Sequence, residues 1–217
     1  MLPTPDVRTN ENVYEPGQDS FLFLDALESE LPFLNTVLKP TTIFEFGPGS
    51  GIISLFLSQN MSAPAFFHLC DINIQACLLS KENFEANSSK AVDCICCDLS
   101  SPLSDSFKKK VDLIIFNPPY VPTTLDEFER SDDILIKSWS GGPCGRIVID
   151  QFVEKCLDFL SVNGCLYLLL VKENLPNDVN SLILTRLPNF EATLILKRRC
   201  ANELLYVFKY APKIYPS

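Results

Sequence analysis

Short apolar runs alternate with segments of helical periodicity along most of the chain. Val111–Phe116 is apolar at nearly every position, which is typical of a parallel strand buried on both faces. The segments between the runs repeat apolar residues at intervals of three and four, the period of an amphipathic helix. This alternation predicts an α/β fold with a doubly wound, mostly parallel sheet and helices on both faces. The expected strands are Thr42–Phe46, Ala65–Cys70, Val92–Cys97, Val111–Phe116, Cys165–Val171, Glu191–Lys197 and Leu204–Tyr210.

Helices are expected before the first strand and between most of the others. Asp19 is expected to cap a first helix from Ser20 to about Leu34, because aspartate is a favoured N-cap residue. Four apolar residues are expected to share one face of that helix: Phe21, Leu24, Leu27 and Leu31. The other expected helices are Ile52–Leu57, Ile74–Asn87, Ile147–Val162 and Val179–Leu187.

The segment from Val121 to about Cys144 has no clear periodicity and is too long for a plain connector. We therefore expect an irregular working loop. Its acidic side chains either rim the mouth of a binding site or form solvated surface, which is the common role of exposed charge. These acids are Asp126, Glu127, Glu129, Asp132 and Asp133.

Composition and charge exclude several classes of protein. The chain has 217 residues, 47% of them hydrophobic, which is enough for one globular domain over 1–217, with an irregular segment and a helix over 1–40 preceding the core at 41–217. With 18 Lys and Arg against 27 Asp and Glu, the net charge of −9 argues against duplex nucleic acid as the main partner. The longest apolar runs are far shorter than the roughly 20 residues of a membrane helix. The first twenty residues resemble no targeting signal, so we expect a cytoplasmic protein, with a nuclear location as the alternative.

Nine cysteines and one histidine could suggest metal binding, but their spacing does not support it. An odd number of cysteines predicts reduced thiols. The cluster Cys94-Ile95-Cys96-Cys97 has no second cysteine pair to complete a zinc site, so we predict no metal and interpret these residues as small apolar core residues. His68 lies inside an apolar strand and is expected to do no chemistry.

A glycine-rich turn follows the first predicted strand, where ligands of doubly wound sheets bind. Glu45, Gly47 and Gly49 lie at this strand end, and the turn opens the next helix. Glycines there let the backbone pass close to a ligand and direct helix N–H groups toward it. Ile52 occupies the position where a dinucleotide fingerprint needs a small residue, so the turn alone does not identify the ligand.

Two aspartates end the next two strands. Asp71 lies about twenty residues after the glycine turn, where an acid hydrogen-bonds the vicinal hydroxyls of a ribose. Asp98, with the backbone of Leu99 beside it, is a candidate acceptor for an exocyclic amine. Each residue alone would be interpreted as a loop acid or a helix cap. Their shared position at successive strand ends makes them candidate ligands.

Asn117-Pro118-Pro119-Tyr120 ends the fourth predicted strand and is the most specific motif in the chain. An amide or aromatic-amine nitrogen is a poor nucleophile, so a site that alkylates it should accept its N–H hydrogens and hold its planar group. Asn117 offers a side-chain carbonyl, Pro118 a main-chain carbonyl on a stiff backbone, and Tyr120 a ring face. The alternative interpretation is a proline stop after a buried strand.

Together these motifs resemble the class I S-adenosylmethionine-dependent methyltransferases that act on a nitrogen attached to a planar group. Val13–Ser20 resembles the Tyr-Glu-Pro-x-Glu-Asp-Thr signature of the eukaryotic branch of release-factor glutamine N5-methyltransferases. Trp139–Arg146 resembles the Gly-Gly-x-x-Gly-Arg segment of that branch, and Glu203–Lys209 its last strand. Gln18 departs from the family's Glu, and Ser20 replaces Thr while keeping the hydroxyl.

The resemblance implies a seven-stranded, Rossmann-like sheet in the order 3-2-1-4-5-7-6. It implies methyl transfer from S-adenosylmethionine to the side-chain amide of the glutamine in the Gly-Gly-Gln loop of the class I translation termination factor. It also implies a heterodimer with a small zinc-binding activator protein, which would cover the sheet edge at Val92–Cys97. Carried over by position, the cofactor-binding residues are Ser20, Glu45, Gly47, Gly49, Asp71, Asp98, Leu99 and Asn117, and the catalytic residues are Asn117, Pro118, Pro119 and Tyr120.

Three alternatives to this function remain at the level of sequence. An adenine-N6 DNA or RNA methyltransferase could use the same motif on a flipped base, but such enzymes normally carry a basic face or an added recognition domain. A protein-lysine methyltransferase could be built on the same scaffold. A non-catalytic relative is disfavoured because every expected catalytic position is filled.

Overall fold

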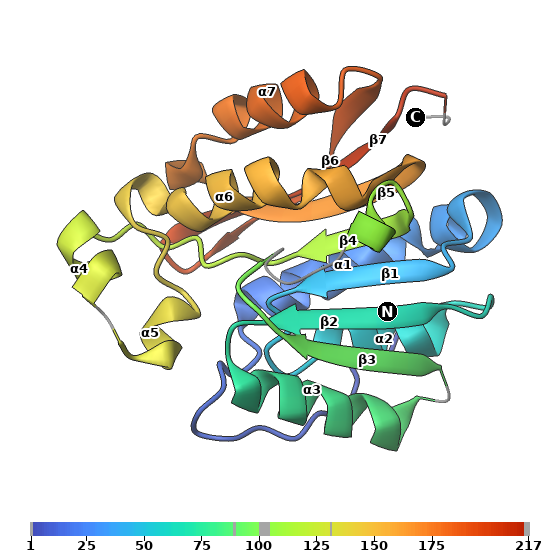
Figure 1. Cartoon of the computed structure of the whole chain (residues 1–217), viewed down its shortest axis with the longest axis horizontal. Coiled ribbons are helices and arrows are strands. Elements are labelled where there is room, and N and C mark those ends of the chain that lie inside the picture. The colour runs from blue at the N-terminus through green and yellow to red at the C-terminus, as the bar shows by residue number, and fades with distance from the viewer. Residues whose placement is uncertain (1, 89, 100–104, 131, 215–217) are drawn as a thin grey trace.

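The computed structural model describes residues 2–88, 90–99, 105–130 and 132–214, and its centre is a seven-stranded sheet (Figure 1). The strand order is β3-β2-β1-β4-β5-β7-β6, which confirms the expected order. The first five strands in this order run parallel, and β7 is antiparallel to both its neighbours. The strands are β1 Thr42–Phe46, β2 Phe66–Asp71, β3 Ala91–Cys96, β4 Val111–Phe116, β5 Leu160–Val171, β6 Phe190–Cys200 and β7 Glu203–Pro212.

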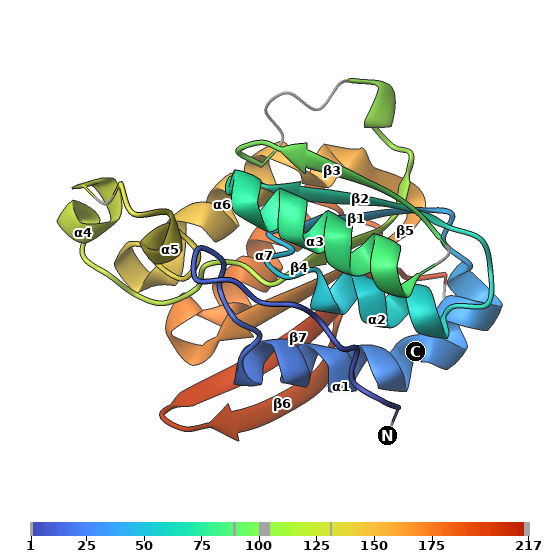
Figure 2. The ribbon, with the colours of Figure 1, turned by 90° about the horizontal axis from the view of Figure 1, so that it is seen from below.

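Helices cover both faces of the sheet, as the alternation of elements predicts. α1 Gln18–Phe33, α2 Ile52–Asn60 and α3 Ile74–Asn87 lie on one face, and α6 Ile147–Lys155 and α7 Pro176–Arg186 lie on the other (Figures 1 and 2). Successive side chains of β4 enter the two cores in turn, because strand residues alternate between faces. This explains why the sequence of β4 is apolar at nearly every position.

The first helix begins earlier than predicted. α1 starts at Gln18 with Gly17 as its N-cap, so the assignment of Asp19 as N-cap is wrong. The Gly17 N–H donates to the Ser20 hydroxyl over 3.4 Å. The Asp19 carboxylate instead accepts from the side-chain NH₂ of Asn117, which follows β4. Phe21, expected on the apolar face, is 43% exposed.

The helix after the glycine-rich segment near residue 145 is shorter than predicted. α6 ends at Lys155 rather than Val162, and Leu160 already belongs to β5. The apolar residues Phe159 and Leu160 suggested a continuing helix, but the Phe159 carbonyl accepts from Lys110 N–H over 3.1 Å and Leu160 pairs with Val111. Pairing with the start of β4 therefore ends the helix.

The segment predicted as an irregular loop contains two short helices, α4 Leu125–Arg130 and α5 Ile134–Lys137. They extend beyond the sheet on one side of the molecule (Figures 1 and 2). The segment leaves and returns at one point, where Val121 N–H donates to the Trp139 carbonyl and Gly141 N–H donates to the Val121 carbonyl, both over 2.9 Å. Helices this short show no periodicity in a sequence, which is why the prediction missed them. Residue 131 of this segment lies outside the described residues.

The cysteines are free thiols, and the histidine lies in a stack of aromatic rings. All nine cysteines are among the described residues, and none forms a disulfide. Cys97 is buried, but Cys94 is half-buried and Cys96 is exposed, so the interpretation of the whole Cys94–Cys97 cluster as core residues is wrong. His68 is stacked between Phe44 and Phe66 with ring centroids 4.6 Å from each, and burial lowers its pKa. In the described part of the chain, no helix has the length and apolarity needed to span a bilayer.

Candidate active site

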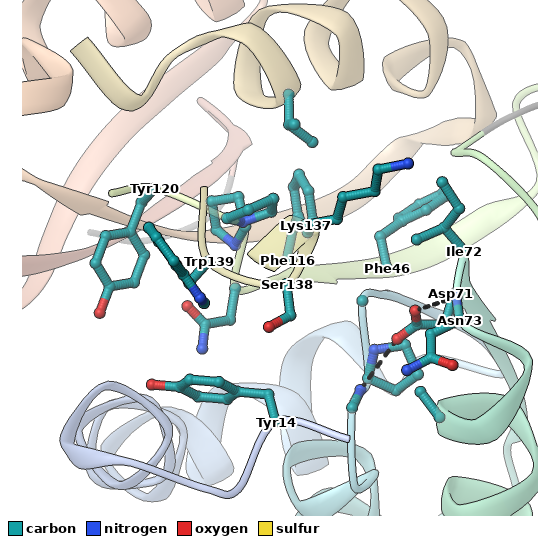
Figure 3. Close-up of a pocket in the computed structure, with 18 of the residues that line it drawn as sticks. Tyr14, Phe46, Asp71, Ile72, Asn73, Phe116, Tyr120, Lys137, Ser138 and Trp139 are labelled. Carbon is teal, nitrogen blue, oxygen red and sulfur yellow. Dashed lines mark hydrogen bonds between the residues drawn. The ribbon is translucent and has the colours of Figure 1, made fainter. Parts of the chain in front are cut away.

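A cavity of about 630 Å³ opens at the carboxyl ends of the parallel strands, a size suited to a small organic ligand. Asp71, Ile72 and Asn73 lie at one end of it, and Tyr14, Tyr120 and Trp139 gather at the other (Figure 3). All but one of the residues predicted for the site line this cavity. Those lining it are Ser20, Gly47, Gly49, Asp71, Asp98, Leu99, Asn117, Pro118, Pro119 and Tyr120.

The glycine-rich turn forms part of the cavity wall. Gly47, Gly49 and Gly51 have φ values of +61°, +54° and +81°, a backbone region that other residues adopt only with strain. A Cβ on Gly51 would lie 3.0 Å from Cβ of Ser80 on α3. The turn therefore needs glycine both for its conformation and for the close packing of α2 against α3.

Asp71 presents its carboxylate at the end of β2. Its Oδ1 accepts from Asn73 N–H over 2.8 Å and its Oδ2 from Gly49 N–H over 3.3 Å (Figure 3). Burial raises the pKa of Asp71 to about 6, while these hydrogen bonds oppose the rise. Above that pH the carboxylate is ionised, and each oxygen has lone pairs left to accept from a hydroxyl.

The third strand ends beside Asp71. Cys97 N–H donates to the Asp71 carbonyl over 2.8 Å, and Asp98 and Leu99 follow in the cavity wall. Leu99 has a φ of +49°, an uncommon conformation for a residue with a side chain. Strained backbone of this kind is concentrated at functional sites.

Glu45 is the predicted residue that does not line the cavity. Its side chain is 1% exposed and lies beneath the glycine turn, where Oε2 accepts from the N–H of Ser54 over 3.0 Å and from the Ser54 hydroxyl. Burial raises the pKa of Glu45 to about 8, so its carboxyl is mostly protonated at neutral pH. Glu45 thus links β1 to the start of α2, which directly follows the glycine-rich segment.

The side-chain amide of Asn117 has a hydrogen-bonded NH₂ group and a buried carbonyl oxygen. Nδ2 donates to Oδ2 of Asp19 over 2.9 Å. Oδ1 is buried, and within the described residues no donor reaches it. A buried acceptor without a donor is costly, so it is unusual unless a ligand or water completes it.

Tyr120 ends the motif. Its hydroxyl donates to Glu203 Oε2 over 3.3 Å, and burial together with the negative charges of Asp19 and Glu203 raises its pKa. The phenol is therefore a neutral group that offers its ring to the cavity.

The chain is similar to known methyltransferases in sequence. The family described as "Methyltransferase small domain" matches residues 17–138. The methyltransferase HEMK2 of Homo sapiens is 35% identical over 199 residues, which cover 92% of this chain and 89% of HEMK2. The chain belongs to the HEMK2 and Mtq2 family of methyltransferases.

Two further relatives place this methyltransferase within its family. The eRF1 methyltransferase catalytic subunit mtq2 of Schizosaccharomyces pombe is 30% identical, covering 96% of this chain and 95% of mtq2. The structure of the Mtq2–Trm112 complex of E. cuniculi, responsible for methylation of the eRF1 translation termination factor, superposes with a TM-score of 0.66 and 28% identity. The superposition covers 93% of this chain and 99% of the matched one. These matches confirm the predicted family and fold.

The Trp139–Arg146 segment of this methyltransferase supports the Asn-Pro-Pro-Tyr motif. A Cβ on Gly141 would lie 2.5 Å from the Pro119 carbonyl oxygen, and one on Gly145 would lie 1.8 Å from the Tyr120 carbonyl oxygen. Glycines are therefore required here because the segment packs directly on the backbone of the motif. The segment also brings Trp139 to the cavity.

Several site residues of the methyltransferase escaped prediction. Tyr14 lies in the Val13–Ser20 signature, but nothing in the sequence alone assigned it a role; burial and the charge of Asp19 raise its pKa to about 12. Asn174 follows β5 and had no sequence signal at all, yet its buried Nδ2 reaches the carbonyls of Tyr120, Cys144 and Gly145.

Most acids of the 121–144 segment have local partners. Asp126 pairs with Arg130 over 2.7 Å, Glu127 accepts from Thr124 N–H over 2.9 Å, and Asp133 caps α5. Of the five acids, Glu129 lines the cavity. Asp126, Glu127 and Asp133 are exposed and bonded within the segment itself, as expected for solvated surface.

Proposed function

We propose that this methyltransferase transfers a methyl group from S-adenosylmethionine to the side-chain amide nitrogen of the glutamine in the Gly-Gly-Gln loop of the class I translation termination factor, leaving S-adenosylhomocysteine. The observation that carries this proposal is the buried, unpartnered Oδ1 of Asn117 at the cavity. An acceptor held in this way suits the N–H of an amide. The named relatives, which include an eRF1 methyltransferase, support the same substrate.

The chain's own residues supply what a weakly nucleophilic amide needs. Asn117 Oδ1 and the Pro118 carbonyl accept the two N–H hydrogens of the glutamine amide and so fix its nitrogen in the cavity. The rings of Tyr120 and Trp139 confine the planar group. S-Adenosylmethionine supplies a sulfonium-activated methyl group when bound. Transfer of this methyl group to the amide nitrogen would leave S-adenosylhomocysteine, and the proton that the nitrogen loses would pass to solvent water.

The residues of the cavity fit the cofactor. The volume suits it, the positive-φ glycines admit a close ligand, and Asp71 can accept from both ribose hydroxyls. We assign the adenine to Asp98 and Leu99. The remaining assignments are the methionine part to Ser20, Gly47, Gly49 and Asn117, with Glu45 acting from beneath the turn. We propose that all of these residues belong to one domain over residues 1–217.

We further propose that a small zinc-binding activator covers the edge of the sheet at β3. β3 is an edge strand, and Ile72, Ile74 and Leu78 expose apolar side chains beside it, Ile74 to 52%. The Mtq2–Trm112 complex supports a small partner for this family. Zinc would belong to the partner, because the described residues contain no group of three His, Cys, Asp or Glu side chains that could hold a metal.

The proposed substrate suggests where in the cell the enzyme works. Translation termination factors work on cytoplasmic ribosomes, so we propose a cytoplasmic enzyme, and fluorescence microscopy of the tagged chain tests this.

Methyl incorporation tests the proposed function. The chain, co-purified with its activator, is supplied with labelled S-adenosylmethionine and with the termination factor, a factor whose Gly-Gly-Gln glutamine is replaced by alanine, or an adenine-containing oligonucleotide. We expect labelling of the intact factor only. Equal labelling of the factor that carries alanine in place of this glutamine would show that another residue, such as a lysine, is methylated. Labelling of the oligonucleotide alone would show that adenine is the substrate. Either result would overturn the proposal.

A further inference from the structure

Asp19 and Asn117 meet in the cavity from two distant elements. Asp19 lies in the first turn of α1, Asn117 directly follows β4, and Asn117 Nδ2 donates to Asp19 Oδ2 over 2.9 Å. Asp19 is 6% exposed and lines the same cavity as Asn117. Neither the cofactor assignment nor the methyl transfer described above uses Asp19.

The chemistry of Asp19 determines which way the Asn117 amide faces. A side-chain amide has a donor end and an acceptor end of nearly the same shape, so packing alone does not distinguish the two orientations. An ionised carboxylate has no hydrogen to donate and can only accept. Asp19 therefore selects the orientation in which the NH₂ group of Asn117 faces α1 and Oδ1 remains the open end.

The surroundings of Asp19 hold its carboxylate in place. The N-terminal turn of a helix favours a negative charge because its N–H groups are unpaired. Ser20 Oγ lies 3.5 Å from Asp19 Oδ1. A Cβ on Gly17 would lie 2.9 Å from that oxygen and 3.1 Å from the Tyr14 hydroxyl, so glycine at position 17 leaves room for the carboxylate.

We propose that Asp19 is a positioning residue that turns the carbonyl of Asn117 toward the substrate amide. This inference rests on the proposed function, in which Asn117 Oδ1 accepts from the glutamine N–H. With the opposite orientation, the NH₂ of Asn117 would face the NH₂ of the substrate, and two donors would oppose each other. Asp19 thus acts through Asn117 and does not itself touch the reacting atoms.

The kinetic test uses Asp19→Asn in the complex with the activator. Asparagine has the same shape but can present either end, so the selection is lost. We expect kcat to fall about 10- to 100-fold, with an unchanged melting temperature and KM for S-adenosylmethionine. Asp25→Asn is the matched control, because Asp25 lies on the same helix and pairs with Arg198 at the surface. It should leave kcat unchanged.

A double-mutant cycle shows whether Asp19 acts through Asn117. Asp19→Asn is combined with Asn117→Ala, and single-turnover rates with excess enzyme are compared. In the Asn117→Ala background, we expect Asp19→Asn to have no further effect. Multiplicative effects of the two substitutions, or wild-type kcat in Asp19→Asn, would overturn the inference while leaving the proposed function intact. A wild-type enzyme that never methylates glutamine would instead overturn the proposed function.

A spectroscopic measurement tests the orientation without turnover. In ¹⁵N-labelled complex, the side-chain NH₂ of Asn117, assigned by its loss in Asn117→Ala, should be protected from hydrogen exchange in the wild type. In Asp19→Asn this protection should fall or a second set of signals should appear. An identical NH₂ signal and exchange rate in both proteins would show that Asp19 does not set the orientation.

Discussion

Asn174 donates a hydrogen bond of 2.9 Å from Nδ2 to the main-chain carbonyl of Tyr120, 54 residues earlier in the chain. The same nitrogen lies within 2.9 Å of the Cys144 carbonyl and 3.2 Å of the Gly145 carbonyl, and Oδ1 accepts from Val171 N–H over 2.8 Å. One fully buried amide therefore joins the end of β5 to both segments that form the Tyr120 and Trp139 end of the cavity.

Asn174→Ala should destabilise the protein and loosen the substrate end of the site. Buried carbonyls would lose their donor, and each such loss costs about 1–3 kcal/mol. We expect the free energy of unfolding in urea to fall by at least about 2 kcal/mol and KM for the termination factor to rise. Asn177→Ala is the control, since Asn177 is exposed nearby on α7. Equal stability of the two variants would show that Asn174 does not hold these segments.

Asn117→Ala should separate catalysis from cofactor binding. Removing an oriented acceptor typically lowers the rate about 100-fold or more. We expect such a fall in kcat with a much smaller change in the Kd for S-adenosylmethionine, measured by calorimetry, because Ser20, Gly47 and Gly49 would still hold the methionine part of the cofactor. If kcat remained above about a tenth of the wild-type value, Asn117 would not be the group that holds the amide.

Cofactor binding should weaken in acid through Asp71. Its pKa in the free enzyme is about 6, and the ionised form is the better acceptor for ribose hydroxyls. As the pH falls through 6 the carboxyl gains a proton, so KM for S-adenosylmethionine should rise between pH 7 and pH 5. Asp71→Asn should raise KM at every pH and remove this dependence, whereas Asp98→Asn should keep it. A flat wild-type profile would exclude Asp71 as the ionisable ligand.

A proline in β3 should block the activator without breaking the sheet. Cys97 N–H donates to the Asp71 carbonyl of β2, and alternation along the strand directs the Cys94 N–H to the open side. Cys94→Pro removes that outward donor, a substitution tolerated on edge strands. We expect Cys94→Pro to fold but not to co-purify with the activator, and Cys94→Ala, which keeps the N–H, to co-purify normally. Equal recovery of both complexes would exclude pairing at this edge.

The sheet was predictable from sequence because parallel strands buried on both faces are apolar at nearly every position, as β4 and the Cys165–Val171 part of β5 are. The boundaries that failed depend on distant contacts. The residues around Leu160 suggest a helix, but Leu160 pairs with Val111 in the sheet. Asp19 has the residue type of an N-cap, but α1 begins one residue before it and its carboxylate accepts from Asn117. In both places a distant partner, which local residue types do not reveal, takes part in the structure.

The strand-end part of the site was predictable for a related reason. Topology brings the carboxyl ends of parallel strands together, so Asp71, Asp98 and Asn117 had to meet. Asn174 could not be found in this way, because an isolated asparagine after a strand carries no pattern. For Glu45 the sequence suggested more than the structure shows. Its place in the motif suggested direct contact with a ligand, but strand alternation in β1 directs its side chain beneath the glycine-rich segment, where it bonds Ser54.

Tandem mass spectrometry of the Gly-Gly-Gln peptide would show directly whether this chain methylates the glutamine side chain. The termination factor is incubated with S-adenosylmethionine and the activator complex of this chain, and the Asn117→Ala complex serves as the control. We expect the added mass of one methyl group on the glutamine side chain with the wild-type complex and, after the same time, a far smaller methylated fraction with the control. An unmodified glutamine, or a methyl group found only on a lysine, would contradict this expectation.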